Sequence, residues 1–218
     1  MRLDFFRLMC AALVFVVAVS SANVVRAQTI WVGAKGGVPL IEPFVLTNAS
    51  TTPNSYTFQT KRYTGGAYAQ VNLPLNFAFE ADALYKRLHY ESNPFLFGSL
   101  HATTNARSWE FPLMVKRTFS VNSLRPYAGI GVSLRRSTGE TNYSNSLLQS
   151  RAVPLELENP WSTGAVLSGG IDVALGKFHL QPEVHYTRWG RRGFVSGDGL
   201  FNSNLNSMDF LIGVAFGR

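Results

Sequence analysis

The sequence predicts an all-β protein built as an eight-stranded antiparallel up-and-down β-barrel, and three observations support this prediction. Residues 178–189 read F-H-L-Q-P-E-V-H-Y-T-R-W, in which apolar and polar side chains alternate. A period of two indicates a strand whose two faces meet different surroundings. The same alternation recurs in seven other segments, and the connections between the segments alternate between short and long. No segment shows helical periodicity.

The alternation defines the strands in chain order. They are expected at about 29–38, 63–73, 77–88, 107–119, 125–136, 161–175, 178–189 and 207–217. The short connections are 74–76, 120–124 and 176–177, and the long ones, rich in Asn, Ser, Thr, Gly and Pro, are 39–62, 89–106, 137–160 and 190–206. Short turns at one end and long loops at the other are typical of bacterial outer-membrane barrels, with the turns in the periplasm. A soluble sandwich gives no reason for this regularity.

Residues 1–27 have the features of a cleavable signal peptide. Two arginines precede a short apolar run at 11–19, and small residues occupy the two positions that a signal peptidase reads before Gln28. The alternative, an N-terminal membrane anchor, is disfavoured because the run is short for a membrane span. We therefore expect a signal peptide at 1–27 and a barrel domain at 28–218. The one cysteine, Cys10, lies in the signal peptide, so the mature chain should contain no disulfide.

The charge balance argues against a soluble nucleic-acid-binding protein. The formal net charge is +7, and removal of 1–27 takes away three Arg and one Asp, which leaves 17 basic and 12 acidic residues. The remaining basic residues are expected around the rim of a barrel, so nucleic acid is a poor candidate partner. No later apolar run is long enough for a helical span, and the remaining chain suffices for one domain.

One face of the predicted sheet is apolar and the other is charged. The charged set contains Lys35, Glu80, Asp82, Lys86, Glu110, Lys116, Arg135, Asp172, Glu183 and Asp209. Inside a soluble core each of these charges would cost several kcal/mol unless it was well paired. If the charged face met water instead, the apolar face would lack a second sheet to cover it. A transmembrane barrel with lipid outside and a polar interior satisfies both faces.

The interior of such a barrel should be closed. Eight strands enclose a space that side chains just fill, so the ten charged residues are expected to form a network of ion pairs in the lumen. Several glycines fall on the inward face, where they would make room for long side chains opposite; they are Gly129, Gly131, Gly164, Gly170 and Gly213. The alternative is a narrow gated pore.

Aromatic and basic residues mark the two rims of the barrel. An aromatic girdle is expected from Tyr63, Tyr85, Trp109 and Tyr186 at one rim, and from Phe77, Phe119, Phe178 and Phe216 at the other. Basic residues lie two positions further toward the loops than the first group, or than Leu134 in the strand at 125–136, in an order that reverses between strands running up and down. They are Lys61, Arg87, Arg107, Arg136 and Arg188. We expect them to hold the phosphates of anionic surface glycolipid; simple snorkelling is the alternative.

The signal peptide, the eight strands and the last strand, M-D-F-L-I-G-V-A-F-G-R, together resemble the small outer-membrane barrel families related to the membrane domain of OmpA and to OmpX. The resemblance covers nearly all of residues 28–218 and is one of pattern, without a specific motif. It implies a location in the bacterial outer membrane, contact with outer-membrane lipids such as lipopolysaccharide, and insertion by the barrel assembly machinery.

Few residues suggest catalysis. His185-Tyr186-Thr187 resembles the His-x-Ser of lipid A 3-O-deacylases, in which the His activates a nucleophilic Ser. Here Thr occupies the nucleophile position, and alternation places both His185 and Thr187 in the lumen, away from lipid. Glu80 and Asp82 could form an acid/base pair or a cation site, but ion pairing with the lysines is favoured. The histidines lack zinc spacing, so no catalytic residue, metal or cofactor is expected.

The expected function is that of an integral outer-membrane barrel with a structural or surface-interaction role and no enzymatic activity. One alternative is an adhesin or ligand receptor that uses the long loops, which carry the aromatic residues Phe95, Phe97, Tyr143, Phe194 and Phe201. A second alternative is a lipid A-modifying hydrolase, and a third is the narrow gated pore.

Overall fold

The computed structural model describes residues 29–46, 55–58, 63–93, 101–119, 124–144, 149–196 and 201–217. The predicted signal peptide, the rim residue Lys61 and the loop residues Phe95 and Phe97 lie outside these described residues. In the part of the chain that the structure describes, no helix is long and apolar enough to cross a membrane.

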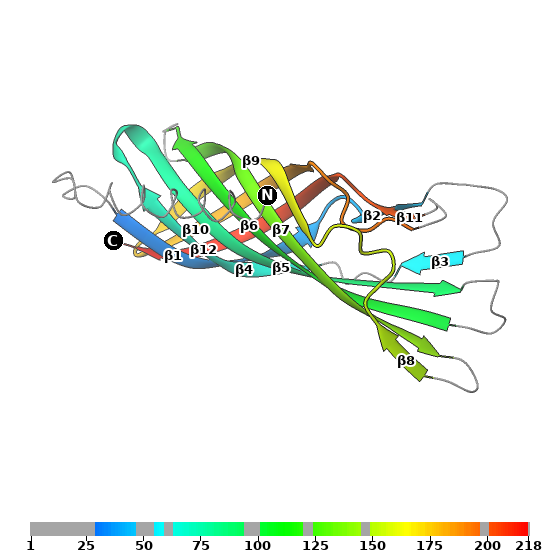
Figure 1. The fold of residues 1–218 in the computed structure, drawn as a ribbon. Coiled ribbons are helices and arrows are strands. Elements are labelled where there is room, and N and C mark those ends of the chain that lie inside the picture. Colours follow the sequence, from blue (N-terminus) through cyan, green and yellow to red (C-terminus); the bar gives the residue numbers. More distant parts are fainter. Residues whose placement is uncertain are drawn as a thin grey trace, which may run out of the picture.

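Eight strands form a closed antiparallel barrel (Figure 1). They are β1 (Thr29–Pro39), β4 (Thr64–Asn72), β5 (Phe77–Asn93), β6 (His101–Thr118), β7 (Arg125–Ser144), β9 (Trp161–Leu175), β10 (Phe178–Trp189) and β12 (Asn206–Gly217). Each pairs with the barrel strand that follows it in the chain, and β12 returns to pair with β1, placing Trp31 opposite Gly217. The predicted fold class is therefore confirmed, including all eight strands.

The strands alternate between a buried and an exposed face, as the sequence pattern predicts. Side chains in β10 alternate almost strictly between a buried and a more exposed environment along the whole strand. The exposed positions are occupied by large apolar residues; for example, Ile130 is 64% exposed and Val132 is 63% exposed. A continuous outward band of this kind is the surface that a transmembrane barrel presents to lipid.

Tight turns connect the strands at the end where the chain passes from β4 to β5 and from β9 to β10. The first is the short 3₁₀ turn η2 (Pro74–Asn76), in which Leu75 and Asn76 adopt the left-handed backbone conformation, with φ values of 64° and 62°. The second uses Gly176, with φ of 68°. Glycine and asparagine tolerate this conformation, whereas Leu75 adopts it at an energetic cost.

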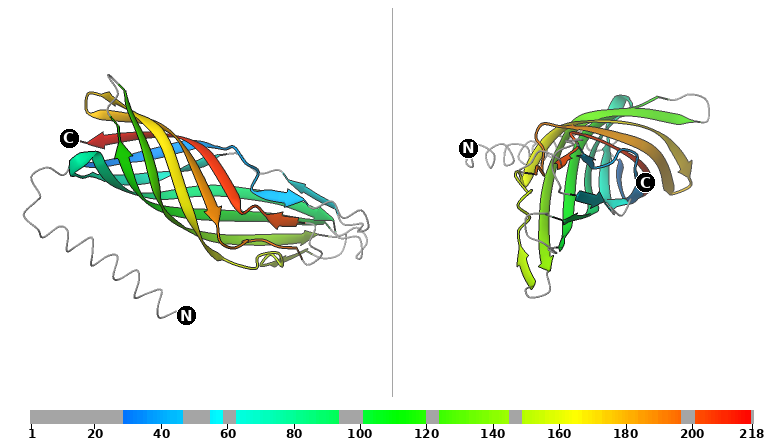
Figure 2. Two further views of the ribbon diagram at one scale, coloured as in Figure 1. Left: turned by 90° about the horizontal axis from the view of Figure 1, so that it is seen from above. Right: turned by 90° about the vertical axis from the view of Figure 1, so that its right-hand side faces the viewer.

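At the opposite end, β5, β6 and β7 continue well past the barrel (Figures 1 and 2). Two short strands extend this sheet at its edges: β3 (Ser55–Phe58) pairs with β5, and β8 (Gln149–Ala152) pairs with β7. We call the sheet β3-β5-β6-β7-β8 beyond the rim the extracellular sheet. The expectation of long loops at 89–106 and 137–160 is wrong for the strand-forming parts of both segments.

The cause of this error is an inversion of the apolar pattern at the rim. Below the rim, the outward positions of β5 are apolar and the inward positions are polar. Above it, Arg87 is exposed and His89 and Glu91 are partly exposed on the outer face, while Leu88 and Tyr90 are buried on the inner face. The strand keeps its alternation of directions, but water replaces lipid on its outside. Because the apolar residues change faces at the rim, the sequence pattern predicts that the strand ends there, although it continues.

The inward apolar residues above the rim are covered by segments of the first, third and fourth long loops. β2 (Phe44–Leu46) pairs with β11 (Phe201–Ser203), and Leu157 forms an isolated bridge with Phe194. We call β2, β11 and the segments containing Leu157 and Phe194 the lid. Phe44 and Phe194 of the lid pack in one cluster with inward residues of β5 and β6; the buried members are Phe44, Leu88, Tyr90, Ala106 and Phe194.

Candidate functional site

The middle of the lumen is crossed by ion pairs, most of them between strands that are not neighbours in the barrel. The Lys35 amine meets three carboxylates, at 2.7 Å from Glu80, 3.0 Å from Asp82 and 2.6 Å from Glu183. Lys116 reaches two of them from another strand, at 2.6 Å from Glu80 and 2.9 Å from Glu183. All five residues are buried. Side chains thus fill the cross-section at this level.

A second group of ion pairs lies nearer the extracellular end. Lys86 is 3.0 Å from Glu110 and 2.7 Å from Asp209, and so connects β6 and β12 through β5. The Thr64 hydroxyl donates a hydrogen bond of 3.0 Å to the other oxygen of Asp209. These residues hold the lumen closed above the central group.

A third group closes the periplasmic end. Asp172 lies 2.9 Å from His179 and 3.4 Å from Arg125. The Trp31 ring stacks on the His179 ring with centroids 3.7 Å apart, although the sequence analysis assigned Trp31 no role. Gly217 lies against this ring, and a Cβ at that position would collide with it.

Two tyrosines fill the remaining space around the central lysines. The Tyr127 hydroxyl donates a 2.9 Å hydrogen bond to Glu183, and the Tyr68 hydroxyl donates one of 2.9 Å to Gln181. A Cβ on Gly170 would lie 2.6 Å from the Tyr127 hydroxyl. The prediction that inward glycines make room for long side chains is confirmed there. The sequence does not predict the role of these tyrosines, because their polarity is intermediate and the alternation alone does not assign them a partner.

Arg135 departs from the prediction. It lies directly opposite Glu110 in the register of β6 and β7, yet it forms no ion pair with it. Its guanidinium instead lies 4.1 Å from the centroid of Trp189, and one Nη donates a 3.4 Å hydrogen bond to Ser162. Glu110 pairs with Lys86, so the carboxylate that lies opposite Arg135 is already engaged.

The residues with suggested catalytic or metal-binding chemistry are enclosed in the central group. His185 and Thr187 are 3% and 6% exposed, and His185 lies 3.0 Å from Glu183. Both side chains therefore point into the lumen and not toward lipid acyl chains. Glu80, Asp82, Glu183 and His185 have ligand atoms close enough to hold one metal ion. The Lys35 amine, however, already contacts all three of these carboxylates.

The described members of the basic rim lie on the outer surface, as expected. The side chains of Arg87, Arg107, Arg136 and Arg188 are all exposed. Arg188 donates a 2.8 Å hydrogen bond to Asn206, and Arg136 lies over the ring of Trp161, a girdle residue that the sequence analysis missed. Arg87 and Arg107 stand directly opposite each other on β5 and β6. The predicted rim thus contains a pair of adjacent cations.

The aromatic girdles also occupy the outer surface at both rims. Tyr85 and Trp109 pack together above the apolar band with ring centroids 5.1 Å apart. Phe178 and Phe216 pack at the other rim with centroids 5.7 Å apart. Arg117 lies over the rings of both Phe77 and Phe119. Tyr63 and Tyr186 also lie on the outer surface, 42% exposed and partly exposed respectively.

A closed antiparallel barrel with an apolar outer band, aromatic rims and a charged interior defines a transmembrane β-barrel protein. The family model for the outer membrane protein beta-barrel domain matches residues 26–190, which is most of the chain. The protein therefore belongs to this family, whose members reside in the bacterial outer membrane.

Solved structures show the same fold. OprG from Pseudomonas aeruginosa shares 13% sequence identity, with a TM-score of 0.53, over 88% of this chain and 95% of that one. Neisserial surface protein A shares 14% identity, with a TM-score of 0.49, over 87% of this chain and 96% of that one. No curated protein matches the chain. At these identities the likeness concerns the fold alone. The fold of OprG and the matching family model confirm the resemblance to small outer-membrane barrels.

Proposed function

We propose that this protein acts at the cell surface by contact, without catalysis and without conducting solutes. The observation that carries the proposal is the occupied lumen: ion pairs and aromatic side chains cross it at three levels. In an eight-stranded barrel, side chains of this size leave no room for a water column. The barrel then serves as an anchor for the extracellular sheet and the lid.

Purified protein is expected to show little or no conductance in planar bilayers. Its folded state is checked by a denaturing gel, on which an unboiled barrel should migrate differently from a boiled one. A variant with Lys116→Ala and Glu183→Ala together, which removes the ion pairs of both residues across the lumen, provides a comparison if it also shows this mobility shift. A large, steady, voltage-independent conductance from the parent protein would overturn the proposal, and stepwise voltage-gated openings would favour the narrow pore.

The position of the basic rim supports the proposal that its arginines bind the phosphates of anionic glycolipid. Like charges directly opposite each other on neighbouring strands repel, and Arg87 and Arg107 have this arrangement just above the Tyr85–Trp109 ring pair. They flank a pocket of about 200 Å³ that is also lined by Asn105 and by Glu140, and Glu140 lies 3.5 Å from Arg151. A phosphate there would relieve the repulsion, and guanidinium groups bind phosphate through a bidentate fork. Arg136 and Arg188 already contact protein side chains.

Replacing Arg87 and Arg107 together with Gln should remove a glycolipid-dependent increment of stability. We expect a loss of about 2 kcal/mol, since each cation near such a surface contributes about 1 kcal/mol. The measurement is urea unfolding in vesicles with and without phosphorylated glycolipid. The control is Arg191→Gln with Arg192→Gln, which removes the same charge from exposed positions at the same end. Equal glycolipid stabilisation of the parent and the Arg87/Arg107 variant would leave snorkelling as the explanation.

The extracellular sheet supports a second candidate function, that of an adhesin or receptor. It extends beyond the rim and has its own apolar core with the lid, so it forms an ordered surface on which a ligand could bind. A hydrolase receives no comparable support, because His185 and Thr187 are buried in the lumen.

A further inference from the structure

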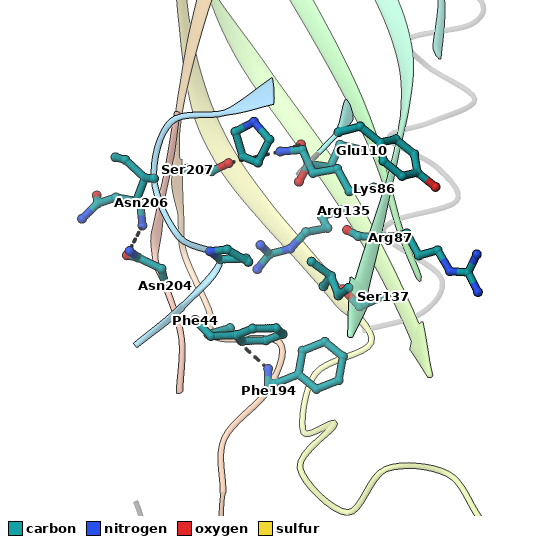
Figure 3. Close-up of a pocket in the computed structure, with 17 residues that line it drawn as sticks. Phe44, Lys86, Arg87, Glu110, Arg135, Ser137, Phe194, Asn204, Asn206 and Ser207 are labelled. Carbon is teal, nitrogen blue, oxygen red and sulfur yellow. Dashed lines mark hydrogen bonds and ion pairs between the residues drawn. The ribbon is translucent and has the colours of Figure 1, made fainter. Parts of the chain in front are cut away.

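A cavity lies between the lid and the second group of ion pairs, those of Lys86 (Figure 3). Its floor carries Lys86, Glu110 and Arg135, and its roof carries Phe44 and Phe194. Ile41, Tyr63 and Asn204 lie at its margin and are partly or largely exposed, so the cavity reaches the surface. The floor of the cavity is thus charged and its roof is aromatic. Its open margin allows small molecules to enter.

Arg135 is a cation that lines this cavity and has no ion pair with a described residue. In Figure 3 its guanidinium points into the space between the floor and the roof, whereas the side chain of Arg87 points away. Its Nε has no hydrogen-bond partner among the described residues, and no described carboxylate lies within ion-pair distance. Glu110 faces Arg135 across the ladder but pairs with Lys86. A cation in a secluded site is stabilised when an anion or other acceptor meets it.

A buried hydroxyl in the same cavity also lacks a partner. Ser108 is 3% exposed, lines the cavity, and its Oγ makes no hydrogen bond with the described residues. Ser137 lies on the same wall and is also 3% exposed. Buried polar groups in folded proteins are nearly always hydrogen-bonded. An oxygen-rich ligand in contact with Arg135 could satisfy both the guanidinium and the Ser108 hydroxyl.

The size and charge of the cavity restrict the ligand. Its volume of about 40 Å³ corresponds to about three water molecules at roughly 10–15 Å³ each. Glu110 and Asp209 already pair with Lys86. Arg135 is therefore the floor cation without an ion pair among the described residues, and a single negative charge matches it better than a double one. The aromatic roof favours an apolar end on the ligand. We infer that this cavity is a binding site for a small monocarboxylate, anchored by Arg135 and covered by Phe44 and Phe194.

The test uses the full protein in micelles and follows the Arg135 side-chain Nε–H signal by NMR during titration with propionate. We expect a saturable shift with a dissociation constant in the millimolar range or below. Propionamide, which has the same shape without the charge, should bind at least tenfold more weakly. Ser108→Ala should weaken propionate binding several-fold, since it removes one hydrogen bond.

Arg135→Gln should abolish propionate binding, as followed by the backbone signals of Ser137 and Phe194. Arg136→Gln is the matched control, because this neighbouring arginine points to the outside, and it should bind as the parent does. If Arg135→Gln does not fold, Arg135→Lys replaces it and should bind more weakly, since it loses the bidentate fork.

The inference is overturned by the absence of a saturable shift in the parent up to 200 mM propionate, or by undiminished binding in the Arg135 variant. Tighter binding of inorganic phosphate than of propionate would equally overturn the assignment to a monocarboxylate. The site goes beyond the proposed function and is tested separately. A conducting barrel would contradict the proposed function without affecting this titration, and failure of the titration would leave the conductance result unaffected.

Discussion

Lys35→Met should lower the free energy of unfolding by about 3–5 kcal/mol, the range observed when one partner of a buried ion pair is removed. The Lys35 amine lies within 3.0 Å of Glu80, Asp82 and Glu183. Without it, Glu80 and Glu183 keep Lys116 as their lysine partner, whereas Asp82 loses its ion pair. Urea unfolding in lipid vesicles, followed by gel mobility, measures the change.

The matched control is Lys177→Met, which removes the same charge from an exposed turn and should change stability little. A second variant separates charge from packing. Asp82→Leu added to Lys35→Met removes a carboxylate that pairs with Lys35, and it should recover part of the loss because one fewer buried charge is left unpaired. An unfolding midpoint of Lys35→Met equal to that of the parent would contradict the ion-pair account.

Phe194→Ala should open the lid while leaving the barrel folded. Phe194 is 2% exposed, and its ring lies 5.8 Å from that of Phe44 and 6.3 Å from that of Tyr90. Removing a buried aromatic ring costs about 3–5 kcal/mol. This cluster and the hydrogen bond that the Tyr90 hydroxyl donates to Glu156 join the lid to the extracellular sheet, so the loss should appear as local opening and not as global unfolding.

The measurement is limited proteolysis of the protein in intact cells, with hydrogen exchange at β2 and β11 as a second readout. We expect at least tenfold faster cleavage in the loops and unchanged heat-modifiable mobility. Val45→Ala is the control, since Val45 belongs to the same two-stranded sheet but is 44% exposed, and it should be cleaved at the parent rate. Equal cleavage of Phe194→Ala and the parent would show that the lid is held by other contacts.

The sequence predicted the barrel wall well because lipid on one side and a polar lumen on the other impose opposite demands on successive residues. It therefore placed Lys35, Glu80 and Glu183 on one face, and the structure brings them together. The network is composed of contacts between strands far apart in the chain, so alternation could supply its members but not its pairs. Arg135 shows this limit, since its opposite neighbour Glu110 turns to Lys86 instead.

The extracellular end was predicted less well, for a different physical reason. Above the rim the protein is bounded by water and carries its own apolar core, so Leu88 and Tyr90 reverse the pattern that marks the strand below. The short strands β2, β3, β8 and β11 are three or four residues long. Segments of that length contain too few alternations to be distinguished from irregular loop.

The pairing of β12 with both β1 and β10 has a consequence for the order of folding. Trp31 pairs with Gly217, and the ladder continues to the pair of Pro39 with Asp209, so the ring closes through contacts between the two most distant parts of the described chain. Such non-local pairing is slow to form. Until β12 arrives, β1 and β10 each present an unpaired edge, which hydrocarbon does not tolerate. Membrane insertion and ring closure must therefore be coupled, and we expect the barrel assembly machinery to act at this seam, protecting two open edges until the last strand joins them.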